Sequence, residues 1–157
     1  MQLRKELRKK IKERLLGKNQ AFEKINVNQR AYDKQSPFIE ITTPEDESEL
    51  ISNSIRATGH NLLVLIDVVA EEKIDIYDEL DDLAEDIETQ IEKDETFGGI
   101  TSSLILTKTE ADAVFEAERT IGFIRLYYKV SYVKQKTPRS DPKIPKLKDI
   151  VVGGMDA

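Results

Sequence analysis

The feature that most constrains this chain is an acidic amphipathic helix that leads through a glycine pair into two strand-like runs. Apolar residues recur at helical spacing over residues 74–91, and carboxylates fill most of the remaining positions. After Gly98 and Gly99, residues 100–107 and 122–133 alternate between apolar and polar side chains, as half-buried strands do. A one-sided helix and one-sided strands bury their apolar faces against each other, which predicts an α/β chain of the α+β kind.

The first part of the chain adds a second helix and two further strands. An apolar residue at every fourth position, among basic side chains, predicts a helix over residues 2–16 with Gly17 as its C-cap. Residues 22–27 and 37–43 are predicted strands because apolar and β-branched side chains recur in them. The second of these strands is expected to end before the proline that follows it.

Residues 50–70 have the pattern of a strand, a turn and a strand. The turn is predicted at residues 58–61, where glycine and asparagine flank His60. Residues 62–70 are almost continuously apolar, which is typical of a central strand covered on both faces. Residues 110–119 either continue one long hairpin or form a helical turn. The prediction is therefore a mixed, mainly antiparallel sheet with two helices packed against it.

One domain and an extended C-terminal arm are expected. With 157 residues and 39% apolar content, the chain can bury one core, which we place in residues 1–133. Prolines recur among lysines in residues 134–157, a composition that favours an extended arm. The arm carries a small apolar tip, formed by Ile150, Val151 and Val152. Such a tip either docks on a neighbouring subunit or stays disordered.

Charge is strongly segregated along the chain. Residues 1–34 carry 11 basic against 4 acidic side chains, residues 35–99 carry 3 against 19, and residues 100–157 carry 10 against 7. Opposite charges in different parts of a small protein favour contacts between copies, because such fields orient the encounter of two surfaces. The alternative is that the charges balance each other within one molecule.

The sequence offers little for catalysis or cofactor binding. The carboxylates between Asp78 and Asp86 could hold a metal or act as an acid–base pair, but a solvated acidic face is the simpler interpretation. The chain has no cysteine, which suits a reducing cytoplasm, and no phosphate-binding glycine loop. Its longest apolar run, Leu62–Ile66, is far shorter than a membrane span. We therefore expect a protein that is not an enzyme and uses no cofactor, metal or membrane.

Two charged segments are the candidate interaction surfaces. The first is the basic side of the N-terminal helix, represented by Arg4, Lys5, Arg8, Lys9 and Lys12. It could contact phosphates, but it lacks aromatic residues to stack on bases, so a solvated face or a contact with the acidic helix of another copy fits as well. The second is an acidic run, made of Glu45, Asp46, Glu47 and Glu49, which is expected to lie in a loop or a hairpin arm.

Taken in order, these elements resemble the tail-terminator proteins of long-tailed bacteriophages, the minor tail protein U type. The resemblance spans about residues 1–133 and is one of order and pattern rather than of a diagnostic motif. It rests on an N-terminal helix with the sequence of residues 3–7, a strand at 37–41, a second strand pair that ends with residues 66–70, the helix at 77–87 and the closing strand at 121–132.

The resemblance implies a subunit of a ring, expected to be a hexamer, in the neck end of the virion tail. In that family the ring sits on the finished tail tube, stops its polymerisation and presents the surface that the connector of the head binds. The partners implied are further copies of the chain, the tail-tube protein and a head-completion or connector protein, with DNA only passing through the channel. The alternatives are another neck, head-completion or tube-related protein, or a small cytoplasmic regulator or enzyme.

Overall fold

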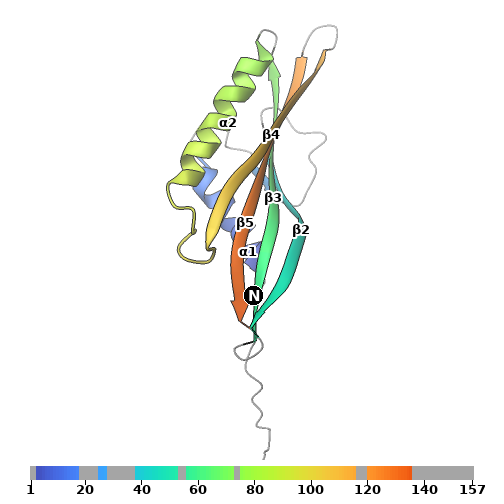
Figure 1. Cartoon of the computed structure of the whole chain (residues 1–157). Helices are drawn as coiled ribbons and strands as arrows, with labels where there is room; N and C mark the ends of the chain where they lie inside the picture. The colour runs from blue at the N-terminus through green and yellow to red at the C-terminus, as the bar shows by residue number, and fades with distance from the viewer. Residues whose placement is uncertain are drawn as a thin grey trace, which may run out of the picture.

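The protein has an α+β fold in which two helices pack on one face of a five-stranded sheet (Figure 1). The computed structural model describes residues 3–17, 25–27, 38–52, 56–72, 75–115 and 120–135. In chain order the elements are α1 (Leu3–Leu15), β1 (Ile25–Val27), β2 (Phe38–Ser52), β3 (Ala57–Glu72), α2 (Ile76–Glu92), β4 (Ser103–Phe115) and β5 (Thr120–Gln135). The predicted helices and the predicted fold class are confirmed.

The sheet is mixed and mainly antiparallel, as predicted, with the strand order β1-β2-β3-β5-β4. Only β1 and β2 run parallel; β2 with β3, β3 with β5, and β5 with β4 are antiparallel. β4 and β5 pair as a long hairpin in which residues 110–115 are strand, so for these residues the interpretation as a helical turn is wrong; residues 116–119 lie outside the described residues. Because β5 continues to Gln135, residues 134 and 135 belong to the sheet and not to the predicted arm; residues 136–157 lie outside the described part of the chain.

Strand alternation places the core on one face of the sheet. The even-numbered residues of β3 and β5 point to the helices, and Gly122 in β5 lets Ile76 and Leu80 of α2 approach the strand closely. In the described residues both helices pack on this inner face. On the outer face of β3, Leu65 is buried, with 7% of its surface exposed, and Leu63 is half-buried, which agrees with the prediction that residues 62–70 form a strand covered on both faces.

The two helices meet at their C-terminal ends, where α1 supplies a cap for α2. The guanidinium of Arg14 donates hydrogen bonds to the carbonyls of Ile91 (3.0 Å) and Asp94 (2.7 Å), and it lies 3.7 Å from the ring centroid of Phe97. Carbonyls in the last turn of a helix have no partner within the helix, and a cation is favourable there. Arg14 therefore joins the two helices. α1 ends at Leu15, and Gly17 just beyond it has φ +79°, the left-handed conformation that is common after the last residue of a helix.

Strands β2 and β3 are longer than the sequence predicts. Residues 58–61 lie inside β3, paired with β2 on one side and β5 on the other, so the predicted turn is wrong and the chain reverses between Ser52 and Ala57 instead. Ladder pairing on both sides outweighs the turn preference of glycine and asparagine. Of the predicted strand at residues 22–27, only Ile25–Val27 falls within the described residues.

Asp94 organises the connection from α2 to β4. Its Oδ1 accepts hydrogen bonds from the amide (3.0 Å) and the hydroxyl (2.7 Å) of Thr96, and its Oδ2 accepts one from the amide of Gly98 (2.9 Å). These hydrogen bonds favour the ionised carboxylate and lower the pKa of Asp94 to about 2. The bond from the Thr96 hydroxyl contributes most.

This pKa gives a pH-dependence prediction. The folded pKa of Asp94 is lower than the unfolded value of about 3.9, so its contribution to stability is present above about pH 4 and is lost as the pH falls toward 2. We expect Asp94→Asn to flatten the fall of the melting temperature between about pH 4 and 2. Thermal unfolding across this range measures it, with Asp82→Asn, an exposed carboxylate on α2, as the control. An NMR titration that gives Asp94 a pKa near 3.8 would contradict the assignment.

Candidate interaction surfaces

An irregularity at Pro44 divides the acidic run between the two faces of the sheet. The register of β2 against β3 shifts between Thr42 and Glu45, so that Ile41 faces the helices before the shift and Asp46 faces them after it. Proline has no amide hydrogen, and it is tolerated in a strand where the ladder is already interrupted. The other three carboxylates of the run lie on the outer face and are exposed: Glu45, Glu47 and Glu49.

The acidic run is therefore not a loop, and that part of the prediction is wrong. Glu45 pairs with Leu63 and Glu49 pairs with Gly59, so the run forms one arm of the β2–β3 hairpin, which was the alternative prediction. Burying an unpaired carboxylate would be costly, but these three side chains stay in water on the outer face. An acidic segment can therefore pair as a strand without that cost.

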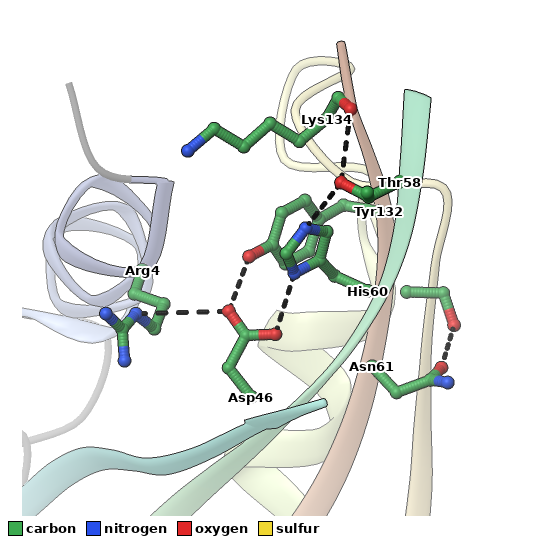
Figure 2. Close-up of polar contacts among 8 residues, drawn as sticks. Arg4, Asp46, Thr58, His60, Asn61, Tyr132 and Lys134 are labelled. Atoms are coloured by element: carbon green, nitrogen blue, oxygen red, sulfur yellow. Dashed lines mark hydrogen bonds and ion pairs between the residues drawn. The ribbon is translucent and has the colours of Figure 1, made fainter. Parts of the chain in front are cut away.

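Asp46 is the centre of a polar cluster that joins α1, β2, β3 and β5 (Figure 2). Its Oδ2 accepts a 2.6 Å hydrogen bond from the hydroxyl of Tyr132 and lies 3.9 Å from Nε of Arg4. Its Oδ1 is 3.0 Å from Nδ1 of His60. The rings of His60 and Tyr132 are stacked, with centroids 4.5 Å apart and planes 12° apart. Burial and the hydrogen bond to Asp46 raise the pKa of Tyr132.

The prediction that His60 lies in a turn is wrong. The residue lies in β3, and its side chain belongs to this cluster. Its side chain is 15% exposed, and its Nε2 lies 3.0 Å from the hydroxyl of Thr58 on the same strand. Asp46, His60 and Thr58 thus stand in the order of a proton relay, but the Thr58 hydroxyl also hydrogen-bonds the carbonyl of Lys134 at 3.4 Å. The arrangement orients the imidazole between Asp46 and Thr58, and Arg4 brings the start of α1 to the same cluster. Side chains two residues apart in a strand lie on the same face. If residues 58–61 had been predicted as strand, the buried position of Leu62 would have placed His60 on the inner face too.

The basic residues of α1 fall into two groups. The arginines form hydrogen bonds or ion pairs with other parts of the chain, whereas no such contact joins the lysines to another described residue. Arg4 approaches Asp46, and Arg8 donates a hydrogen bond to the hydroxyl of Thr43, so neither is a free contact for a partner. Burial and the nearby Arg4 lower the pKa of Arg8. The remaining candidates lie at positions i, i+4 and i+7 on one side of the helix and form the lysine stripe: Lys5, Lys9 and Lys12.

Helix α2 has the opposite character. Its apolar side is buried as predicted, and the helix contains no basic residue. Four exposed carboxylates follow the side away from the sheet at positions i, i+4, i+7 and i+14 and form the acidic stripe: Asp78, Asp82, Glu85 and Glu92. Burial raises the pKa of Glu88, and its neighbours Glu92 and Glu85 raise it further. Across the described residues, no group of three or more histidine, aspartate or glutamate side chains is placed to hold a metal.

The outer face of the sheet carries a polar network that the sequence analysis missed. Arg125 binds Asp67 through two hydrogen bonds of 2.7 and 3.0 Å, and these bonds raise the pKa of Arg125. Nearby, the hydroxyl of Tyr127 donates to Glu110, which also pairs with Lys108 at 3.0 Å. Exposed apolar side chains lie on the same face, among them Ile105, Val114 and Phe123. Only the strand register, which the sequence does not give, brings these residues together.

Comparison with known proteins adds no assignment: no protein-family model matches the chain, and no curated protein matches its sequence. Within the described part of the chain, neither helix is long and apolar enough to cross a membrane. The predicted apolar tip, formed by Ile150, Val151 and Val152, lies outside the described residues.

Proposed function

We propose that this protein is a phage tail terminator, a structural subunit whose ring caps the tail tube, stops its polymerisation and forms the surface to which the head attaches. The observation that carries the proposal is the order of elements: an N-terminal helix, a strand hairpin, a helix packed across the sheet and a closing hairpin. The resemblance to tail terminators rests on a similar succession of an N-terminal helix, strands, a second helix and a closing strand.

The distribution of surfaces supports a function in assembly. The outer face of the sheet carries exposed apolar side chains among charged ones, and the helix layer carries two stripes of opposite charge. Several distinct contact surfaces on a small subunit suit a protein that must bind its own copies, a tube and a connector. The same features fit another neck or tube-related ring subunit, which is the second candidate.

The proposed partners are further copies of the chain in a hexameric ring, the tail-tube protein and the head-completion or connector protein. DNA would only pass through the channel. If the outer face of the β2–β3 hairpin lines that channel, Glu45, Glu47 and Glu49 would repel the phosphates and keep passing DNA from binding. The proposal includes no cofactor and no enzymatic activity, and it places the protein at the neck end of the virion tail after assembly in the host cytoplasm.

Deleting the gene from the phage or prophage that encodes the chain tests this function. We expect electron microscopy to show tail tubes much longer than normal that do not join heads, and complementation with the gene should restore both length and joining. Normal-length tails that join heads in the deletion strain would contradict the proposal. Normal-length tails that fail to join heads would instead indicate the second candidate, a neck protein that acts after termination.

A further inference from the structure

We propose that the lysine stripe of α1 binds the acidic stripe of α2 in a second copy of this chain. The inference rests on the proposed function in one respect, since it identifies the surface through which neighbouring subunits of the ring would meet. The stripes are the same as defined above, and each belongs to a helix whose apolar side is already buried in its own core.

The two stripes do not neutralise each other within one molecule. The helices touch at their C-terminal ends, where Arg14 reaches the carbonyls of Ile91 and Asp94. In the view of Figure 1, α2 lies beside the upper part of the sheet and α1 lies lower, so the two helices do not run side by side along their lengths. Among the described residues no ion pair joins a lysine of the stripe to a carboxylate.

The acidic stripe is also unfavourable as it stands. Asp78 and Asp82 are four residues apart, as are Asp81 and Glu85, and like charges at this spacing destabilise a helix. Burial raises the pKa of Glu88 most, and the neighbouring carboxylates of Glu92 and Glu85 raise it further, as expected where negative charges lie close together. A cationic surface against α2 would relieve this repulsion.

The spacing of the two stripes matches. Lys5, Lys9 and Lys12 span seven residues, and so do Asp78, Asp82 and Glu85; at a rise of about 1.5 Å per residue both stripes are about 10 Å long. Two helices laid side by side could therefore pair three charges with three. Lysine stems also cover apolar surface while their ammonium groups reach a partner.

A second copy is the occupant that fits best, because the complementary surface occurs once in every copy. α1 packs against the β1–β2 side of the sheet, whereas α2 packs against β3, β5 and β4, so the two surfaces of one subunit face different neighbours. A contact between two different surfaces of identical chains is heterologous, and such contacts build a ring when the rotation closes.

Two charge-reversal variants test the interface. The first reverses the lysine stripe by Lys5→Glu, Lys9→Glu and Lys12→Glu. The second reverses the acidic stripe by Asp78→Lys, Asp82→Lys and Glu85→Lys. Each variant alone would place like charges at every contact, and we expect the concentration needed for assembly to rise at least about tenfold, measured by sedimentation velocity. A control variant changes the net charge by the same amount as the first variant, but away from the stripe, by Lys10→Glu, Lys129→Glu and Lys134→Glu, and it should assemble as the wild type does.

Mixing the two variants in equal amounts is the decisive step. When the two variants alternate, the reversed lysine stripe of the first variant meets the reversed acidic stripe of the second. The original lysine stripe of the second variant meets the original acidic stripe of the first. Every contact then joins opposite charges, so assembly should return to the wild-type mass. Recovery also shows that both variants are folded. Failure to recover, or wild-type assembly of either variant alone, would overturn the interface while leaving the proposed ring intact. A wild-type chain that stays monomeric at every concentration and salt would overturn the interface and the ring together.

Discussion

Replacing Leu83 by alanine is expected to lower the free energy of unfolding by about 2–5 kcal/mol. Leu83 lies on the apolar side of α2, is only 4% exposed and belongs to the hydrophobic core, so its truncation leaves a cavity between helix and sheet. The matched control is Asp82→Asn on the next position of the same helix, which is exposed and should change stability by less than about 0.5 kcal/mol. Chemical denaturation measures both, and equal effects would mean that the helix faces are misplaced.

Replacing Gly122 by alanine is the second substitution with a large expected effect. A Cβ atom at this position would lie 2.5 Å from Cγ1 of Ile76 and 2.8 Å from Cδ1 of Leu80, so α2 would have to move away from β5. Forcing extra volume into a packed core costs about 1–3 kcal/mol. We expect a loss of stability in this range, measured by urea denaturation.

Two further variants make the Gly122 prediction specific. Gly59→Ala is the control, because the added Cβ would come closest to Cδ1 and Cγ1 of Ile51, at 3.0 and 3.2 Å, and that side chain is half-exposed and free to move. The double variant Gly122→Ala with Ile76→Ala should be more stable than the sum of the two single effects, because the smaller residue at 76 makes room for the new methyl group. A strictly additive double variant would show that the two positions are not in contact.

The sequence predicts the helices of this fold much better than the ends of its strands. Helical periodicity depends on local spacing, so the apolar sides of both helices could be read directly from residues such as Leu7 and Leu83. The turn assigned to residues 58–61 failed because pairing with β2 and β5 holds these residues in a strand, and that pairing involves residues far away in the chain. Pro44 was expected to end a strand and instead lies at an irregularity within it.

The candidate surfaces were predictable only in part for the same reason. The spacing of Lys5, Lys9 and Lys12 is local, so their place on one side of a helix follows from the sequence. The contact between Asp46 and Tyr132 joins residues 86 positions apart and depends on the register of three strands. One-dimensional patterns do not contain that register, and His60 was therefore assigned to a turn.

The measurement that tests the central proposal most directly is cryo-electron microscopy of isolated phage tails, viewed at the end of the tube that joins the head. The account predicts a closed ring at this end, in which each subunit fits the α+β fold and successive subunits bring α1 of one copy against α2 of the next. Tube ends that carry no density for this chain, or a ring whose subunits have a different fold, would contradict it.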